Sequence, residues 1–285
     1  MPQSVQPNTQ QAALWNDASG KAWVEMQPIL DGVLAPLASL VVDAGDPGKG
    51  GDVLDIGCGA GATTLAMARR VGNGGRCVGL DISRPLVARA TERARVEAVA
   101  NASFEVGDAQ AYAFKSGRFD AVVSRFGVMF FDDPGAAFAN IRGAARRGGK
   151  LAFVAWRGPR ENDFMTTAAR AAAPFLPQAP VPDPDAPGQF AFADGARVRR
   201  ILEGERLVVS QSRTGGRAVS DRRGSSDDIC HPAGAGRRCV ARGRPGDGRK
   251  DHRGLACCIQ AFRGGRKGSF HCRLLAGHRA GLKVV

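Results

Sequence analysis

The sequence predicts an α/β fold with a mostly parallel, doubly wound sheet. Over residues 52–156, short apolar runs alternate with longer amphipathic or alanine-rich segments. Glycines or acidic residues stand where several of the apolar runs end. Strands that alternate with helices in this way form a parallel sheet with helices on both faces. Ligands of such sheets bind beyond the carboxyl ends of the strands, so those ends are where site residues are expected.

The expected strands and helices mostly alternate along the chain. Strands are predicted at 52–56, 76–81, 103–106, 119–124 and 150–156. Helices are predicted at 62–71, 84–100, 134–146 and 195–202. Pro85 stands in the first turn of its helix, where its missing N–H costs nothing. Ahead of the first strand, residues 10–43 are expected to be helical, with a break near 16–20.

The chain consists of two parts that differ in charge and composition. Residues 1–204 carry 22 basic and 21 acidic side chains, whereas residues 205–285 carry 18 and 6. All four histidines and five of the seven cysteines lie in the second part. We therefore expect an N-terminal helical lid (1–50), a main domain (51–204, with an excursion at 157–194) and a basic tail of low order (205–285).

Several classes of protein are disfavoured. The longest apolar run, Val33–Val42, is broken by Pro36 and is shorter than the roughly 20 residues of a bilayer span. Residues 1–11 are polar and lack the pattern of a signal peptide, so a cytoplasmic location is expected. The tail has no aromatic interleaving for nucleic-acid stacking and no zinc-ligand spacing. Nucleic acid and a bound metal are therefore not expected.

The first candidate site segment follows strand 52–56 and contains Asp55, Gly57, Cys58, Gly59 and Gly61. Glycines at a strand-to-helix turn let the backbone approach a ligand closely, and the next helix offers free N–H groups. Two alternatives stand beside this interpretation. The glycines can serve a tight turn only, or they can belong to a dinucleotide site, whose fingerprint they match loosely.

Three further segments end the next strands. Asp81 closes strand 76–81, where a carboxylate can accept from both ribose hydroxyls or merely cap a helix. Asp108, after strand 103–106, is placed to accept from an adenine amino group. Residues 124–131 form an aromatic loop, for whose phenylalanines core packing is the alternative.

Taken in order, these segments resemble the class I S-adenosylmethionine-dependent methyltransferases, whose fold is Rossmann-like. The shared features are Asp-x-Gly-x-Gly-x-Gly, an acidic end to the second strand, Gly-Asp-Ala, and Phe-Asp opening the fourth strand. The run 124–131 and the pattern Trp15-Asn16…Gly20…Trp23 resemble the ubiquinone/menaquinone-biosynthesis subgroup. The resemblance covers about residues 9–203. A dinucleotide enzyme would carry its glycines near the domain start, whereas about 50 residues precede them here.

The resemblance implies S-adenosylmethionine as cofactor and a set of contacts to each part of it. These are Asp55, Gly57, Cys58, Gly59 and Gly61 around the methionine moiety, Asp81 at the ribose, Ile82, Asp108 and Ala109 at the adenine, Arg125 and Phe126 near the methyl group, and Trp15 and Trp23 in a lid. It further implies methyl transfer to a small-molecule acceptor.

The expected chemistry is metal-independent, in-line displacement, because a sulfonium is already a good leaving group. Residues 1–204 contain no histidine, so a general base would be Asp, Glu or Tyr112, and none is assigned. Phe164, Phe175, Phe190 and Phe192 are candidates for an apolar acceptor pocket. The alternatives are a cofactor-binding protein without turnover and a basic-tailed nucleic-acid binder.

The tail is predicted to be translated out of frame. With free choice of synonymous codons and a start one nucleotide later, residues 200–222 give RILEASGLSSVRVEPVDVPLAI. Residues 253–282 give EALRAAFKPFEAGGKVHFTAACWLATAPA. Both strings have strand and helix periodicity, so a one-base insertion or two-base loss near 203–205 is inferred. In the chain as it stands, the sixth and seventh strands of the fold are expected to be missing.

Overall fold

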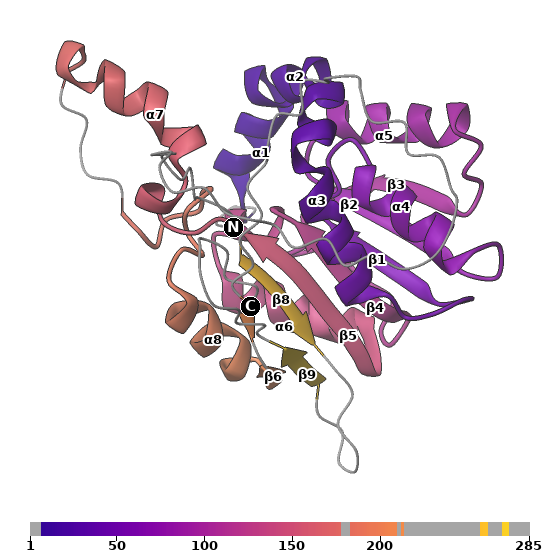
Figure 1. Ribbon diagram of the computed structural model, residues 1–285. Helices are drawn as coiled ribbons and strands as arrows, with labels where there is room; N and C mark the ends of the chain where they lie inside the picture. The colour runs from indigo at the N-terminus through magenta and orange to yellow at the C-terminus, as the bar shows by residue number, and fades with distance from the viewer. Residues whose placement is uncertain (1–6, 178–182, 210–211, 214–256, 262–269, 274–285) are drawn as a thin grey trace, which may run out of the picture.

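The computed structural model describes residues 7–177, 183–209, 212–213, 257–261 and 270–273. Its α-helices are α1 (Thr9–Asn16), α2 (Ala18–Glu25), α3 (Gln27–Gly45), α4 (Ala62–Val71), α5 (Arg84–Val96), α6 (Pro134–Ala144), α7 (Asp163–Ala172) and α8 (Gly195–Gly204). Its strands are β1 (Asp52–Ile56), β2 (Arg76–Asp81), β3 (Ala102–Val106), β4 (Phe119–Arg125), β5 (Ala145–Ala155), β6 (Leu207–Val209), β7 (Ser212–Arg213), β8 (Cys257–Ala261) and β9 (Phe270–Arg273). Short 3-10 helices are η1 (Val128–Phe130), η2 (Pro159–Glu161) and η3 (Ala173–Phe175). Figure 1 shows the helices packed around one sheet.

Within the described residues the strands form a single sheet, and β1 to β5 make its parallel half. The order is β3-β2-β1-β4-β5-β8-β9-β6, and β7 pairs with β8 beside this path. From β1 the chain continues to β2 on one side of the sheet, whereas β4 continues to β5 on the other. Such a switch in strand order opens a crevice beyond the carboxyl ends of β1 and β4. The predicted doubly wound, mostly parallel sheet is confirmed.

The two central strands, β1 and β4, are apolar on both faces. Val53 and Leu54 in β1, and Val122 and Val123 in β4, are each at most 1% exposed. Parallel strands carry apolar side chains on both faces because helices cover both. Each such side chain contributes roughly 1.5–3 kcal/mol when fully buried. These strands therefore make a rigid frame whose carboxyl ends can hold a site.

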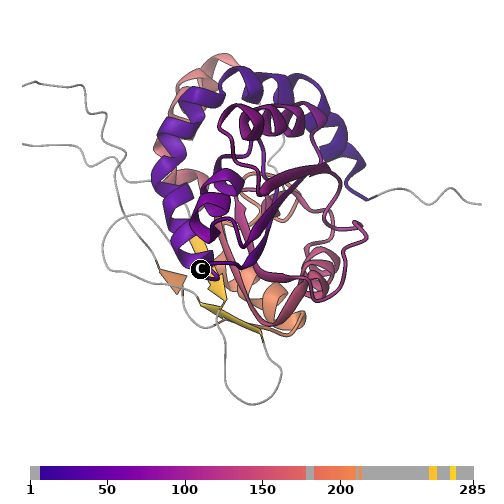
Figure 2. The same ribbon diagram turned by 90° about the vertical axis from the view of Figure 1, so that its right-hand side faces the viewer.

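Helix α3 packs along one side of the sheet, with α1 and α2 across its end (Figure 2). By length and composition alone, α3 passes a test for a membrane span. Its face with Leu34, Leu37 and Val41 is buried in the main core, however. Gly45 at its end lies so near β4 that an added Cβ would stand 2.3 Å from Val123 Cγ1. The helix is therefore a core element of the domain.

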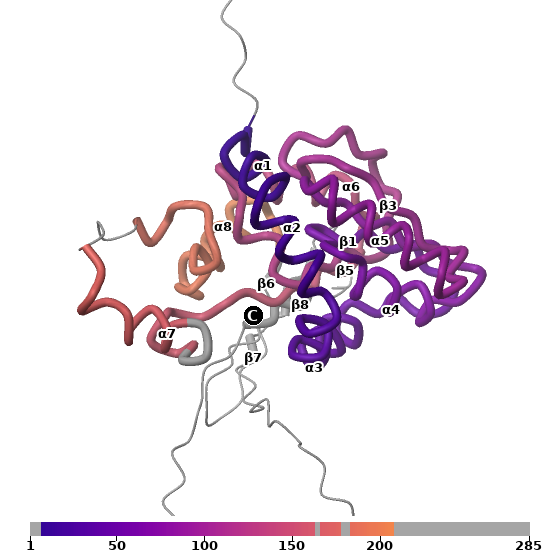
Figure 3. Tube along the Cα trace, turned by 90° about the horizontal axis from the view of Figure 1, so that it is seen from above, coloured from indigo at the N-terminus to yellow at the C-terminus, as the bar shows by residue number. Residues whose placement is uncertain are grey.

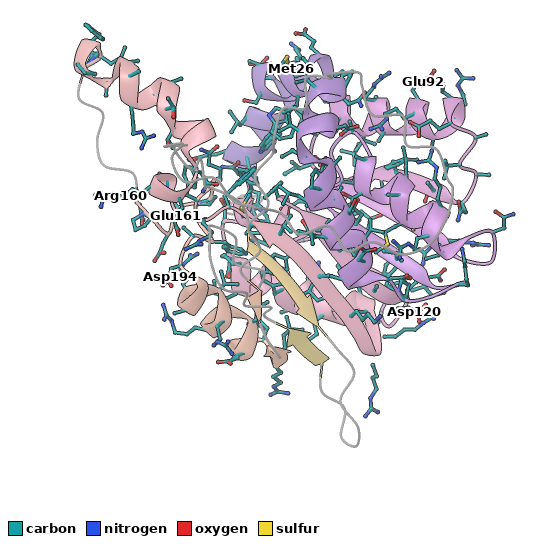
Figure 4. All side chains as sticks on the ribbon, in the orientation of Figure 1. Met26, Glu92, Asp120, Arg160, Glu161 and Asp194 are labelled. Carbon is teal, nitrogen blue, oxygen red and sulfur yellow. The ribbon has the colours of Figure 1, made fainter. Side chains whose placement is uncertain are left out.

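The N-terminal segment consists of three helices in place of the two that one break would give. The predicted break occurs at Asp17, and a second one, which the sequence analysis did not include, occurs at Met26. Met26 lies at one end of the molecule and Asp120, at the start of β4, lies at the other (Figure 4). Helices α1 and α2 thus cover the end of the sheet where the parallel strands terminate.

The excursion at 157–194 contains helix α7, which was not predicted. Seen from above, α7 lies at the outer edge of the molecule, on the side opposite α4 and α5 (Figure 3). The chain then returns to the core, where Phe192 is 1% exposed and packs near Phe138 and Phe153 at centroid distances of 6.2 Å. The excursion is thus anchored at its end by aromatic packing.

The expectation that β5 forms the edge of the sheet, with no strands after it, is corrected by the structure. Strand β8 pairs antiparallel with β5 over residues 152–155, and β9 and β6 continue the sheet. The unpaired N–H and C=O groups of an edge strand attract another strand through main-chain hydrogen bonds. Such bonds depend little on side-chain periodicity, which is why the periodicity of the tail did not indicate these strands.

The other expectations for the tail concern mostly residues 214–256, 262–269 and 274–285, which lie outside the described residues. They include the altered reading frame and the low order of the tail, and both stay predictions.

Candidate functional site

A cavity of about 530 Å³ lies at the carboxyl ends of the parallel strands, beneath α1 and α2. Ten of the thirteen predicted site residues line it, namely Trp15, Trp23, Gly57, Gly59, Asp81, Ile82, Asp108, Ala109, Arg125 and Phe126. The volume is within the range of small-molecule sites, roughly 300–1,000 Å³. The structure thus brings together residues from five separate parts of the sequence.

The two glycines that line the cavity after β1 have different surroundings. Gly57 has φ +64°, and an added Cβ would lie 2.5 Å from Gly127 Cα. Gly127 has no room for a side chain either, since an added Cβ there would lie 2.4 Å from the carbonyl oxygen of Ile56. Gly59 has φ +54°, yet no described atom lies within 4 Å of its hypothetical Cβ. Gly57 therefore serves the close approach of two loops, whereas Gly59 faces open space where a ligand fits.

Three predicted residues are not among those that line the cavity, and their assignment as cofactor contacts stays a prediction. Asp55 is 1% exposed and accepts a hydrogen bond of 2.6 Å from Thr64 Oγ1. Cys58 is buried near Gly79, where an added Cβ would meet its Sγ at 2.9 Å. Gly61 directly precedes α4 and has φ +84°. The buried side chains of Asp55 and Cys58 support the loop from behind, and spacing in the sequence does not distinguish support from contact.

Asp55 gives the fold a dependence on pH. Burial raises the pKa of Asp55 from 3.8 to about 7, although Thr64 and Arg125 act against the shift. Between these two values the folded protein holds a proton that the unfolded chain has lost. Stability contributed by this group is therefore complete below about pH 4 and is lost as the pH rises through about 7.

We accordingly expect Asp55→Asn to flatten the decline in unfolding free energy between about pH 4 and about pH 7. Denaturant unfolding of the variant and the parent chain at several pH values measures this. The difference in unfolding free energy between the variant and the parent chain should grow as the pH rises across that interval. A difference that stays constant would show that Asp55 titrates normally in the folded protein.

Asp81 ends β2 at the centre of the cavity. Its Oδ2 accepts from the backbone N–H of Gly59 at 2.8 Å, and its Oδ1 accepts from that of Ser83 at 2.8 Å. Burial raises the pKa of Asp81, while these backbone donors oppose the rise. Each carboxylate oxygen has a further lone pair. The residue can therefore tie the glycine loop to β2 and still accept from two neighbouring hydroxyl groups of a ligand.

Asp108 is oriented by Asn8, a residue that the sequence analysis missed. Asn8 Nδ2 donates to Asp108 Oδ1 at 2.7 Å, and Asn8 also exchanges two hydrogen bonds of 2.6 Å with Asp132. Asn8 is 2% exposed and has φ 54°. Asp108 Oδ2 is buried and has no hydrogen-bond partner among the described residues. An unpaired buried carboxylate oxygen is costly, so this atom is suited to an N–H donor of a ligand.

We expect Asn8→Ala to weaken binding of an adenine-containing ligand by about 10- to 100-fold, because it removes a buried hydrogen bond to a charged group. Isothermal titration with S-adenosylhomocysteine measures the loss. The exposed neighbour Gln10→Ala is the matched control and should bind like the parent. Equal affinities for the two variants would exclude a positioning role for Asn8.

A second set of polar contacts fixes the covering helices to the loop after β2. Asn16 Nδ2 donates to the carbonyl oxygen of Ile82 at 2.9 Å, and its Oδ1 accepts from the N–H of Arg84 at 2.8 Å. Ser83 Oγ donates to the carbonyl oxygen of Trp15 at 2.6 Å. Trp15 stands edge-on to Trp23 at a centroid distance of 5.7 Å. Polar contacts therefore hold both ends of α1, and Trp15 of this helix packs against Trp23 of α2.

Arg125 is the last residue of β4 and lines the cavity. Its Nη2 stands 3.7 Å from Asp31 Oδ1 on α3, a carboxylate that also receives Arg93 Nη1 at 3.0 Å. Arg93 Nη1 further donates to the carbonyl oxygen of Ala60 at 2.6 Å. Burial lowers the pKa of Arg125, while Asp31 and Asp55 oppose the shift. Asp31 and Arg93 were not predicted, because only the docking of α3 beside the loop makes them part of the site.

Phe126 adopts φ +65°, a left-handed conformation that costs a non-glycine residue about 1–2 kcal/mol. Its ring lies flat on Trp156, with centroids 4.0 Å apart and an interplanar angle of 4°. Of the predicted acceptor phenylalanines, Phe175, Phe190 and Phe192 do not line the cavity, and the side chain of Phe164 lies outside the described residues. Phe175 is 87% exposed, and Phe192 belongs to the core. Of that segment, Pro187 to Gln189 line the cavity instead.

Two acidic residues, Asp132 and Asp133, follow the aromatic loop and have different roles. Asp133 caps α6, accepting from the N–H of Ala136 at 2.9 Å, as expected for a turn residue. Asp132 has the additional role of holding Asn8. Tyr112 donates its hydroxyl to Glu105 and does not line the cavity. None of these residues is placed to remove a proton from a molecule in the cavity.

Comparison with known proteins agrees with this geometry. Residues 53–149 match the family of methyltransferase domains. Nocamycin O-methyltransferase of Saccharothrix syringae is 36% identical over 116 residues, covering 41% of each chain. Aklanonic acid methyltransferase DauC of Streptomyces sp. (strain C5) is 34% identical over 119 residues, covering 42% of this chain and 54% of that one. The chain thus spans about half the length of these relatives.

A solved structure adds to the comparison at the level of fold. Haemonchus contortus phosphoethanolamine N-methyltransferase 2, in complex with S-adenosyl-L-methionine, is 19% identical, with a TM-score of 0.54. The match covers 75% of this chain and 47% of that chain. At this identity it shows the shared fold alone. Neither named relative belongs by name to the ubiquinone/menaquinone-biosynthesis subgroup, so that finer assignment stays a prediction.

Proposed function

We propose that this chain, whose residues 53–149 form a class I S-adenosylmethionine-dependent methyltransferase domain, transfers a methyl group to a small-molecule acceptor. The observation that carries the proposal is the arrangement of Gly59, Asp81 and Asp108 around one cavity under a closed lid. Each has free space or hydrogen-bonding capacity directed to a ligand. Both named relatives are methyltransferases, and one is an O-methyltransferase.

The described residues fit the cofactor part by part. Asp81 would accept from the two ribose hydroxyls, and Asp108 Oδ2 would accept from the adenine amino group. Ile82 and Ala109 would contact the adenine ring, and the open space beside Gly59 would admit the methionine chain. Trp15 and Trp23 would cover the cofactor from the lid. Arg125 and Phe126 would lie near the transferred methyl group.

The protein's part in the reaction is to align and to exclude water. Bound S-adenosylmethionine supplies an activated methyl group on a good leaving group. Phe126 and Trp156 provide an apolar wall that directs the acceptor and keeps water away. The lid contacts of Asn8 and Asn16 hold the cavity closed during transfer. No residue has to form a covalent bond, and the proposed displacement needs no metal.

A turnover assay tests the proposal. The chain is incubated with radiolabelled S-adenosylmethionine and a panel of quinols, phenols and carboxylic acids, with and without a chelator. We expect label in at least one acceptor, formation of S-adenosylhomocysteine in equal amount, and no loss on chelation. Cofactor binding without transfer to any acceptor would favour the alternative of a catalytically impaired relative. Loss of transfer on chelation would contradict the metal-independent mechanism.

We further propose that restoring the reading frame after residue 203 stabilises the chain. The alternative frame supplies segments with strand and helix periodicity, which would bury more apolar surface against the sheet than the arginine- and glycine-rich tail as a whole. The restored chain should therefore unfold at a higher urea concentration than the chain as given. Equal midpoints would contradict this, as would a resequenced gene that shows no inserted or lost base at this point.

A further inference from the structure

We propose that the methyl acceptor is an organic anion with a flat apolar body, and that Arg125 receives its charged oxygen. This inference rests on the proposed methyl transfer and adds the chemical class of the acceptor. It follows from the charge, the proton acceptors and the shape of the cavity wall.

The charge of the wall is the first observation. Among the described residues, Arg125 is the one cationic side chain that lines the cavity. Its Nη1 is buried and has no hydrogen-bond partner there. Arg125 lies 3.7 Å from the carboxylate of Asp31, which it shares with Arg93, whereas Arg93 also pairs with Glu97 at 3.3 Å. Near neutral pH the charge of Asp55 is weakened, because burial raises its pKa to about 7. Arg125 is thus only weakly paired, and a guanidinium N–H pairs best with an anionic oxygen.

The second observation is that the cavity offers no general base. Its described lining contains no histidine, lysine, tyrosine or cysteine. Its carboxylates, Asp81 and Asp108, already accept from backbone or from Asn8 and are assigned to the adenosine moiety. A hydroxyl or carboxyl nucleophile that enters here therefore has to arrive deprotonated. Carboxylic acids and acidic phenols meet that condition at neutral pH. The carboxylate or phenolate oxygen would form the new bond to the methyl carbon as the bond from that carbon to sulfur breaks, and the sulfur would keep the electron pair.

The third observation is the shape of the wall near Arg125. The parallel rings of Phe126 and Trp156 both line the cavity, and Leu30, Val33 and Pro187 complete the apolar surface. The two rings cover each other's facing surfaces, so an acceptor would meet the outer face or the edges of this pair, against which a flat conjugated body packs well. An acceptor with a flat apolar body and a charged oxygen at one edge fits both the aromatic wall and Arg125.

One other anion competes for Arg125, namely the amino-acid carboxylate of the cofactor itself. The two possibilities separate cleanly, because 5′-methylthioadenosine has the adenosine and sulfur of the cofactor but lacks that carboxylate. If Arg125 binds the cofactor, Arg125→Met weakens the binding of S-adenosylhomocysteine but not that of 5′-methylthioadenosine. If Arg125 binds the acceptor, neither nucleoside is affected.

The experiment is a set of titrations on the chain saturated with S-adenosylhomocysteine. The probes are 2-naphthoate against its neutral isostere 2-naphthamide, and 4-nitrophenolate against 4-nitroanisole. We expect each anion to bind at least about tenfold more tightly than its neutral partner. Arg125→Met should abolish that preference, and Arg125→Lys should keep part of it. Arg146→Met, which removes a half-exposed cation outside the cavity, is the matched control and should bind like the parent.

The outcomes distinguish this inference from the function on which it rests. Normal binding of S-adenosylhomocysteine together with equal affinity for charged and neutral probes would overturn the inference and leave the proposed function intact. The same holds if no probe binds, or if Arg125→Met weakens S-adenosylhomocysteine alone. Failure to bind S-adenosylhomocysteine would overturn both. A preference for naphthoate without one for nitrophenolate would identify the acceptor as a carboxylic acid, and the reverse would identify a phenol.

Discussion

Gly59→Ala is expected to keep the fold and to weaken cofactor binding about 10- to 100-fold, whereas Gly57→Ala is expected to destabilise the fold itself. The added methyl at Gly59 would project into open space, at the cost of about 1–2 kcal/mol for its positive φ. At Gly57 the same methyl would lie 2.5 Å from Gly127 Cα. Because Gly127 Cα is a backbone atom of a packed loop, it cannot easily move aside. We therefore expect Gly57→Ala to lower the unfolding free energy by about 3 kcal/mol or more.

Denaturant unfolding and titration with S-adenosylhomocysteine, performed on both variants, separate these effects. The pair acts as its own control, since the two substitutions are chemically identical and both stand at positive φ. If Gly59→Ala unfolds as readily as Gly57→Ala, both glycines serve the turn only. If Gly59→Ala binds the cofactor normally, the open space beside it is not part of the site.

Asp81→Ala is expected to reduce affinity for S-adenosylhomocysteine by about 100-fold or more. Two charge-assisted hydrogen bonds to ribose would be lost, each contributing roughly 1.5–3 kcal/mol. The N–H of Gly59 would also lose its acceptor, which would loosen the glycine loop. Asp81→Asn, which keeps an acceptor oxygen but removes the charge, should lose less.

The control for this variant is Asp43→Ala, a substitution on the exposed side of α3. It removes the same charge far from the cavity and should leave the affinity unchanged. Calorimetry on the three variants gives the comparison directly. An affinity for Asp81→Ala within a few-fold of the parent would show that β2 does not hold the ribose.

The residues that sequence alone could predict are those whose position follows from strand order. Asp81 and Asp108 each follow a strand, and the ends of parallel strands meet at one edge of the sheet. Their convergence on one cavity was therefore predictable. The core strands were equally accessible, because runs such as 52–56 and 119–124 are apolar enough to be buried on both faces.

The residues that were missed depend on how distant segments dock. Asn8 reaches Asp108 across 100 positions of sequence, and its role comes from a left-handed turn ahead of α1. Asp31 belongs to the site only because α3 packs beside β4. Phe175 and Phe192 show the opposite error, since an aromatic residue in a proline-rich segment gives no sign of whether it faces solvent, core or cavity.

The central claim is that residues 52–130 and the lid above them form a complete cofactor site in this chain. Calorimetric titration of S-adenosylhomocysteine into the parent chain tests it most directly, with NADH as the comparison ligand. The geometry predicts saturable binding at one site and no binding of NADH, because the cavity complements one nucleoside and its sulfur side chain. Absence of S-adenosylhomocysteine binding, or preference for NADH, would contradict the assignment of the site.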